Sequence, residues 1–385
     1  TSAAEFLGDD KIKESSTGRR DFLKFLGFSV AAATVAACEA PVVKAIPYVN
    51  KPENVTPGMP TWYASTYYDG NNYASILVKT REGRPIYIKG NKDQGITKGG
   101  ANAQIIASVL GLYDSARLTM PQTKKGAEWE GSRFSNADKK IKSALKSANK
   151  VVLVSNTVIS PSLSWAIGDL AESLGETRDE ATGMLSSNKF EHIQYDAVSY
   201  AGMRAANKAT FGLTERDGNG IIPSYDFTKA HTIVSVGADF LGTWLLPTQF
   251  ATDYTGRRDP DGEWMSKHFQ FEALMSLTGS NADVRAMVKP SEYANVLAAI
   301  AKGVGASVSG VSTKLDKKAQ EAVNKAVKAL KSSKKKSIVV CGSNNTALQI
   351  LTNKINAKLG AYNETINVNE TCLLYTSDAA DEHSW

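Results

Sequence analysis

Three short apolar runs limit the folds open to this chain of 385 residues. Residues 151–154, 232–236 and 338–341 are rich in valine and isoleucine, and helical spacing follows the first and the last of them. Continuous apolar runs of this length are typical of strands buried on both faces of a parallel sheet. Because strands alternate with helices, the sequence predicts an α/β fold with a doubly wound, mostly parallel sheet. A crevice for a nucleotide-type ligand would then lie at the carboxyl ends of these strands.

Turn and cap residues place further elements along the chain. Ser160 can cap the helix after the first run, Pro161 suits its first turn, and Gly175 suits its end. Gly83 separates two β-rich runs and can adopt the positive φ of a tight turn, which predicts a small N-terminal β-hairpin region. The remaining predicted elements are hairpin strands at 75–80 and 84–89, a strand at 191–195, helices at 103–113, 136–148 and 197–209, and an amphipathic helix at 314–331.

The segment 1–37 has the pattern of an export signal. Arg19 and Arg20 precede Phe22, Leu23 and Lys24, and the apolar stretch that follows is too short to span about 30 Å of hydrocarbon. A basic segment, a short apolar segment and small residues in this order are typical of secretory signals. The arginine pair resembles the twin-arginine motif, with glycine where serine or threonine usually precedes it. We therefore expect export to the periplasmic face of the inner membrane.

Cys38 follows a small-residue stretch that resembles a lipobox. Cleavage before Cys38 and lipidation of its thiol would anchor the protein to the membrane. The alternative is a cysteine that merely lies in an alanine-rich cleavage region. Beyond it, prolines indicate an extended tether over 38–60.

The folded domain is predicted to cover 61–371. It divides into an N-terminal hairpin segment, 61–125, and an α/β part, 126–371. Residues 372–385 resemble the translation of a sequencing adapter and are not expected to belong to the folded domain.

Composition excludes several functional classes. The chain is 42% hydrophobic and 22% charged, which is ordinary for a globular protein, and its net charge of +6 does not indicate a nucleic-acid partner. Cys341 alone falls within the domain and is expected to be a buried, inert thiol, whereas a cubane cluster takes four thiolates. The histidines before the tail are too scattered for a metal site. The sequence thus predicts no catalytic, cofactor-binding or metal-binding residue in this fragment.

Two further motifs are expected to have structural roles. Gly303 and Gly305 lack the preceding strand that a dinucleotide-binding loop requires. Charged residues between 253 and 263, next to Trp264, are interpreted as a solvated loop with internal ion pairs, with a docking loop as the alternative.

Residues 78–121 resemble the N-terminal segment of the molybdopterin oxidoreductase superfamily. In that family a hairpin with a Gly–Arg turn leads to Gly–Asn and then to a Leu–Tyr–Asp…Arg–Leu…Pro stretch. The matching residues are Gly83, Arg84, Gly90, Asn91, Leu112, Tyr113, Asp114, Arg117, Leu118 and Pro121. Residues 230–239 are similar to the strand-plus-glycine segment of the family's nucleotide-binding domain, and the resemblance spans about 60–370.

The departures from this family concern its redox centre. Active members place three cysteines before the hairpin and a fourth after it, whereas 63–74 and 98–103 contain none here. No serine, cysteine or aspartate matches a molybdenum-ligand motif. The resemblance therefore implies a molybdopterin-oxidoreductase-like fold that has lost its chemical centre.

Residues 44–66 and 268–292 look like one branch of the family, the large periplasmic subunit of alternative complex III, a quinol:cytochrome c oxidoreductase. This resemblance implies a non-catalytic scaffold without a cofactor of its own, with iron–sulfur clusters in a C-terminal half absent from this chain. It also implies other subunits of a membrane respiratory complex as partners and a membrane contact through the lipid anchor. The alternatives are a catalytic molybdopterin-dependent subunit and a non-redox assembly lipoprotein.

Mass spectrometry of the mature N-terminus tests the signal and lipidation assignments. We expect a chain that begins at a lipid-modified Cys38, because signal peptidase cuts before the cysteine of a lipobox. A Cys38→Ala variant should not be lipidated and serves as the control. A mature protein that still contains Arg19 and Arg20 would contradict the assignment.

Overall fold

A computed structural model describes residues 53, 55–70, 72–158, 160–178, 186–214 and 220–371. Nearly all of them belong to one compact unit that begins at Pro57. The predicted signal, Cys38, most of the tether and residues 372–385 lie outside the described residues. Within the described part, no helix combines the length and the apolar character needed to cross a bilayer.

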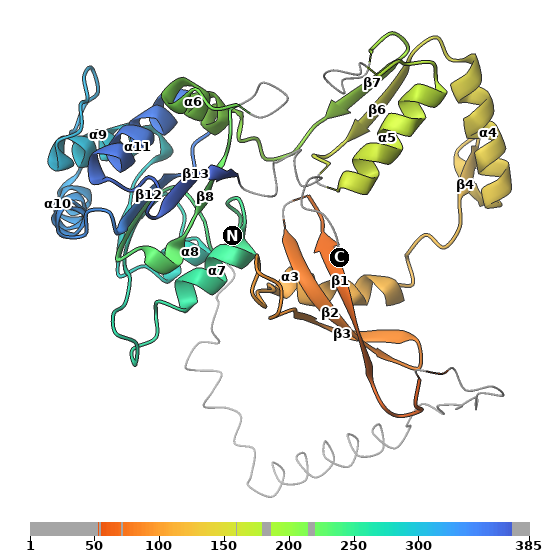
Figure 1. Cartoon of the computed structure of the whole chain (residues 1–385), viewed down its shortest axis with the longest axis horizontal. Helices are drawn as coiled ribbons and strands as arrows, with labels where there is room; N and C mark the ends of the chain where they lie inside the picture. Colours follow the sequence, from red (N-terminus) through yellow and green to blue (C-terminus); the bar gives the residue numbers. More distant parts are fainter. Residues whose placement is uncertain are drawn as a thin grey trace, which may run out of the picture. The chain divides into compact units, whose positions relative to one another are not determined.

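An antiparallel sheet opens the described chain. It has the order β1–β2–β3, formed by Thr61–Tyr68, Tyr73–Arg81 and Arg84–Gly90 (Figure 1). The predicted hairpin is confirmed, and Gly83 has a φ of 78° at its turn. The first strand was not predicted. Ala74, Ile76 and Ile88 pack against Ile105 to form a small core of their own.

The middle of the chain is built from short elements. The predicted helix 103–113 is α-helical only in α3, after which it continues as the 3₁₀ helix η1. The hairpin β4–β5 was not predicted. The elements are α3 (Ala103–Ala107), η1 (Ser108–Tyr113), β4 (Gln122–Lys125), β5 (Glu128–Gly131), α4 (Phe134–Ser147), β6 (Val151–Ser155), α5 (Pro161–Ser173) and β7 (Phe190–Gln194).

A four-stranded parallel sheet with the order β11–β10–β9–β12 organises the rest. Its strands are β9 (Thr232–Val236), β10 (Lys267–Glu272), β11 (Val284–Met287) and β12 (Ser337–Cys341). The accompanying helices are α6 (Ala201–Phe211), η2 (Phe227–Lys229), α7 (Pro247–Thr255), α8 (Leu277–Ser280), η3 (Pro290–Glu292), α9 (Tyr293–Val304), α10 (Lys317–Ser332) and α11 (Thr346–Leu359). The strands β8 (Pro223–Tyr225) and β13 (Ile366–Thr371) form a separate antiparallel pair.

Two hydrophobic cores cover the two faces of this sheet. On one face, Val234, Phe269 and Val339 pack against α9, α10 and α11. On the other face, Ile233 and Ile338 pack among aromatic residues that include Phe250 of α7. Figure 1 shows α9, α10 and α11 together on one side of the sheet and α7 on the other. The predicted α/β fold, with its doubly wound parallel sheet and its small N-terminal β-hairpin region, is confirmed.

The prediction for the first apolar run is only half right. Residues 151–154 form β6, and the helix after it is capped by Ser160, which accepts a hydrogen bond from the backbone of Leu163. However, β6 pairs only with β7 among the described strands, and Val152 and Val154 are 46% and 64% exposed. The expected burial on both faces is therefore wrong for this strand, because nothing in the described part of the chain covers the face that carries Val152 and Val154.

Glycines allow a close approach where β9 and β12 end. Gly237 follows β9 with a φ of 67°, and Gly342 follows β12. A Cβ atom on Gly342 would lie 2.1 Å from the carbonyl oxygen of Gly237. Only glycine can therefore follow β12 without displacing the neighbouring backbone.

Gly342→Ala tests this close approach. We expect the free energy of unfolding, measured by urea denaturation, to fall by about 2 kcal/mol because a backbone segment must move. Gly111→Ala is the matched control, since a Cβ there meets nothing within 4 Å, and it should change stability by less than about 0.5 kcal/mol. Equal stability of the two variants would contradict the packing.

Candidate functional site

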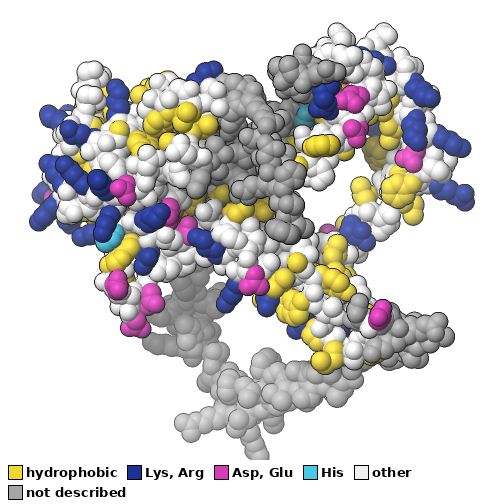
Figure 2. All heavy atoms as spheres, in the orientation of Figure 1, with side chains coloured by type: hydrophobic (Ala, Val, Ile, Leu, Met, Phe, Trp, Pro, Cys, Tyr) yellow, Lys and Arg dark blue, Asp and Glu magenta, His cyan; other side chains and the backbone are white. Residues whose placement is uncertain are grey.

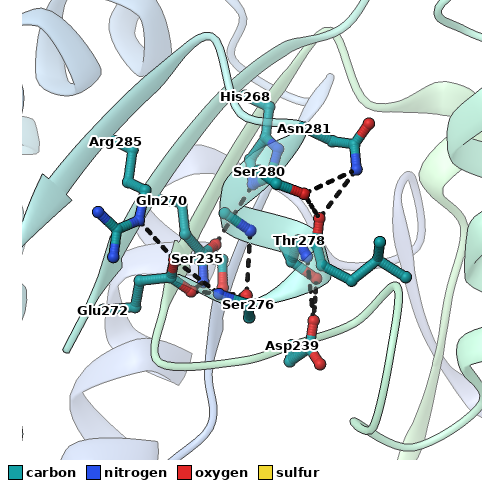
Figure 3. Close-up of polar contacts among 12 residues, drawn as sticks. Ser235, Asp239, His268, Gln270, Glu272, Ser276, Thr278, Ser280, Asn281 and Arg285 are labelled. Carbon is teal, nitrogen blue, oxygen red and sulfur yellow. Dashed lines mark hydrogen bonds and ion pairs between the residues drawn. The ribbon is translucent and has the colours of Figure 1, made fainter. Parts of the chain in front are cut away.

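The carboxyl edge of the parallel sheet is the place where this fold class binds ligands. The strand order places β10 and β12 on opposite sides of β9, so the edge beyond β9 and β12 is a topological switch point. Six polar residues gather near this edge, mostly around the end of β10, and are called here the carboxyl-edge network: Asp239, Gln270, Glu272, Ser276, Thr278 and Arg285 (Figure 3).

Glu272 ends β10 and is the centre of the network. Its carboxylate accepts hydrogen bonds from Gln270 Nε2 at 3.0 Å, from Ser276 N and Oγ at 3.1 and 2.6 Å, and from Arg285 Nε at 2.7 Å. A carboxylate offers about four acceptor sites. These four donors therefore leave it no capacity for a ligand.

The charge of Glu272 is fixed by the same contacts. Burial raises its pKa, but the hydrogen bonds from Ser276, Arg285 and Gln270 outweigh that effect, and the pKa lies below its usual value. The carboxylate is therefore ionised at neutral pH. An ionised, fully hydrogen-bonded group cannot act as a general base without breaking the network.

The short helix α8 packs directly on this carboxylate. A Cβ on Gly279 would lie 1.8 Å from Glu272 Oε1, so only glycine fits there. The Ser276 hydroxyl, which donates to Glu272, also accepts a hydrogen bond from Gly279 N at 3.0 Å. The space beside Glu272 is thus filled by the chain itself.

Asp239 connects the loop after β9 to α8. Its Oδ1 accepts hydrogen bonds from Thr278 N at 3.1 Å and from Thr278 Oγ1 at 2.7 Å. Thr278 Oγ1 in turn accepts one from Leu241 N at 2.9 Å. These bonds hold the loop after β9 and α8 in one arrangement.

A buried polar row continues down β10 from Glu272. His268 lies between the Tyr254 hydroxyl and Gln270 Oε1, at 3.3 Å from each. Burial lowers the pKa of His268 to about 4, so the imidazole is neutral at pH 7. The row satisfies its own polar groups within the core.

The helix N-termini near this edge also have partners of their own. Asn345 caps α11 by accepting hydrogen bonds from Ala347 N at 2.9 Å and Leu348 N at 3.3 Å. Asn344 Oδ1 accepts one from Gly202 N at 2.7 Å, at the start of α6. A dinucleotide-type cofactor needs free amides at a helix N-terminus to bind its pyrophosphate. Here these amides are hydrogen-bonded to Asn344 and Asn345, and the carboxylates of Asp239 and Glu272 lie at the same edge. The residues present therefore do not fit that group.

The described residues also offer no metal centre. No group of three or more histidine, cysteine, aspartate or glutamate side chains in the described part is arranged to hold an ion. Cys341 is buried as predicted, and burial raises the pKa of its thiol to about 11. It is therefore an unreactive core residue.

The first block of the family resemblance folds as a local unit. Gly83 lies in the turn and Arg84 begins β3, and the Tyr113 hydroxyl donates to the Pro85 carbonyl at 2.5 Å. Gly90 approaches the backbone so closely that its Cβ would lie 2.0 Å from the Gly99 carbonyl oxygen. The signal residues and Cys38 lie outside the described residues.

The interpretation of the charged cluster after 253 is wrong in part. Asp253 is buried in α7 and pairs with Lys98 Nζ at 3.1 Å. Arg258 pairs with Asp283 through contacts of 2.9 and 3.0 Å. The ion pairs are therefore made with residues outside the cluster, which a local pattern cannot reveal.

Asp239, Glu272 and Arg285 were not singled out by the sequence analysis. One signal was present, because His268, Gln270 and Glu272 alternate with Phe269 and Phe271. Such alternation predicts a strand with one polar face. It does not reveal that this face is buried.

No known family model and no curated protein matches this sequence. Among solved structures, acetylene hydratase from Pelobacter acetylenicus matches with a TM-score of 0.42 and 11% identity, over 77% of this chain and 43% of that chain. A chain of the formyltransferase/hydrolase complex from Methylorubrum extorquens, in complex with methylofuran, matches with a TM-score of 0.36 and 13% identity, over 60% of this chain and 56% of that chain.

The present chain spans less than two thirds of the length of each of these two chains. Both likenesses are distant.

Glu272→Gln tests the charge of the network. The folded-state pKa of Glu272 is lowered, so its carboxylate stabilises the fold above about pH 4.3, the usual glutamate value, and this contribution is lost as the pH falls through the folded pKa. We expect the variant to lose about 3 kcal/mol of unfolding free energy at pH 7, because Arg285 loses its partner.

The difference between wild type and variant should shrink as the pH falls below 4, as measured by urea denaturation across pH. Glu263→Gln removes the same charge at an exposed position and should leave stability unchanged within about 0.5 kcal/mol. A loss for Glu272→Gln that does not vary with pH would contradict the account.

Proposed function

We propose that this chain is the non-catalytic scaffold portion of a periplasmic electron-transfer subunit of a quinol:cytochrome c oxidoreductase of the alternative complex III type. One observation carries the proposal: the carboxyl-edge network leaves no acceptor site on Glu272 for a ligand. Where a catalytic relative would need room and free donors, this chain places its own side chains.

The sequence supports the same conclusion by a separate route. The hairpin that resembles the molybdopterin family has no cysteine on either side of it, although active members use four cysteines there. In this proposal, the missing cluster ligands and the filled space beside Glu272 together account for a part of the chain without a redox centre. In this proposal electrons pass through iron–sulfur clusters held elsewhere in the subunit.

A scaffold needs a surface for its partners, and the segment with β6 and β7 offers one. Val152, Val154 and Ile193 lie on one face of this parallel pair and are exposed. In the view of Figure 2 only scattered hydrophobic side chains are visible in this part of the chain, among polar and charged ones, so the face is identified from the exposures. Parallel sheets are normally covered on both faces. We assign this face to another part of the respiratory complex, one that supplies apolar side chains.

The N-terminal signal and Cys38 complete the proposal. Export by the twin-arginine route and lipidation of Cys38 would hold the scaffold at the periplasmic face of the inner membrane. There it would lie beside the membrane subunits that oxidise quinol.

Val154→Asp tests the partner surface. A charge on the exposed face of β6 should leave folding intact, because Val154 is 64% exposed, but should block association with an apolar partner. In the native host we expect the variant to lose at least tenfold in co-purification with the membrane complex. The matched control is Leu274→Asp, which adds the same charge at a residue that is 84% exposed and lies outside this face.

Two outcomes would overturn the assignment. Co-purification of Val154→Asp at the wild-type level would show that the face is not an interface. Partners without any redox subunit would favour the assembly lipoprotein over an electron-transfer subunit.

A further inference from the structure

The amino edge of the parallel sheet carries a cationic cavity that has no part in the proposed scaffold role. His231 immediately precedes β9, Lys336 immediately precedes β12, and Trp264 lies shortly before β10. These residues line a cavity of about 270 Å³ together with Arg257, Lys229 and Lys335. This amino-edge cavity lies at the opposite end of the strands from the carboxyl-edge network.

An aromatic and cationic stack forms one part of the cavity. The His231 and Trp264 rings are stacked, with centroids 3.8 Å apart and planes 13° apart. The Arg257 guanidinium lies 4.5 Å from the centre of the Trp264 ring. Arg257 Nε also donates to the Thr228 carbonyl at 2.7 Å. These contacts hold the guanidinium in place before any ligand arrives.

The charge of the cavity is not balanced by the chain. Four cations line it, while Glu364 is the carboxylate in the same lining. Glu364 Oε1 lies 3.9 Å from Lys335 Nζ. Lys229 Nζ forms an ion pair with Asp226 Oδ2 at 3.0 Å. Arg257 and Lys336 make no ion pair within the described part of the chain. Two cations therefore face the cavity without a counter-charge.

The backbone around the two lysines is held in an uncommon conformation. Lys335 has a φ of 67°, which is unusual for a residue other than glycine. Lys335 N donates to the Leu359 carbonyl at 2.9 Å, and the Lys336 carbonyl accepts from His231 N at 2.8 Å. Strained residues that their surroundings hold in place are frequent at binding sites.

We propose that the amino-edge cavity binds a phosphate group, with Arg257 and Lys336 as its principal ligands. Guanidinium and ammonium groups are the side chains that recognise phosphate in proteins. The Trp264 ring is already stacked with His231 and contacted by Arg257, which leaves it poorly placed to stack on a nucleobase. The ligand is therefore a simple phosphate, either free or in a phospholipid headgroup, rather than a nucleotide.

The electrostatics around His231 provide a spectroscopic readout. Burial lowers the pKa of His231, and the charges of Lys336 and Arg257 lower it further. Lys229 and Lys335 add positive charge to the cavity, and Glu364 adds negative charge. A bound anion offsets the cations and should raise the pKa of His231 toward its usual value.

The test is an imidazole NMR titration of the full chain with inorganic phosphate at constant ionic strength. We expect saturable binding with a rise in the pKa of His231. Lys336→Gln and Arg257→Gln should each weaken phosphate about tenfold, the order expected for one charge-assisted hydrogen bond. Lys325→Gln removes the same charge from an exposed position of α10 that does not line the cavity, and should bind as wild type does.

A second arm identifies the source of the phosphate. Sedimentation with phosphatidylglycerol vesicles that depends on Lys336 would support a lipid headgroup, whereas phosphate binding without sedimentation would support a free anion. The proposal is overturned if phosphate leaves the pKa of His231 unchanged, or if Lys325→Gln weakens binding as much as Lys336→Gln. The lysines would then serve only to complement the carboxyl ends of nearby helices.

Discussion

The burial of β9 between two parallel neighbours is the constraint on which the α/β unit depends. All five of its residues are buried, and its two faces belong to two different hydrophobic cores. Full burial of one large apolar side chain stabilises the fold by about 1.5–3 kcal/mol. Ile233 on one face and Val234 on the other therefore both stabilise the packing of a helical layer against this strand. The loop after β9 must then leave the sheet beside β12, where Gly237 and Gly342 permit the backbones to touch.

That constraint also explains the chemistry of the two ends of the sheet. At the carboxyl edge the loops after β9 and β10 are bound to each other through Asp239, Thr278 and Glu272. The ion pair between half-buried Arg285 and buried Glu272 adds little net stability, but breaking it is costly because it leaves the buried carboxylate unpaired, so it fixes one arrangement of the loops. At the amino edge, Arg257 and Lys336 lie where the strands begin and keep their charges available. The same sheet thus has internally bonded polar side chains at the carboxyl end of β10 and a cationic cavity at its amino edge.

Local sequence patterns correctly predicted those elements whose burial follows from their own residues. The runs at 232–236 and 338–341 became the fully buried strands β9 and β12, and the alternation of alanine and lysine at 314–331 became α10. Gly305 proved to be the left-handed cap of α9, in agreement with the rejection of a dinucleotide loop. The predictions failed where residues distant in the sequence determine whether a side chain is buried. Residues 151–154 look like a buried strand, yet nothing in the described chain covers Val154, and the polar residues of β10 are buried only because other loops supply their hydrogen bonds.

We propose that this chain is a molybdopterin-oxidoreductase-like scaffold without a place for the cofactor. Molybdenum and released pterin, measured on the protein purified from its native membrane, test this most directly. The carboxyl-edge network, which fills the space beside Glu272, predicts far less than one molybdenum atom and no pterin per chain. About one molybdenum atom and one pterin per chain would contradict the claim and favour a catalytic subunit.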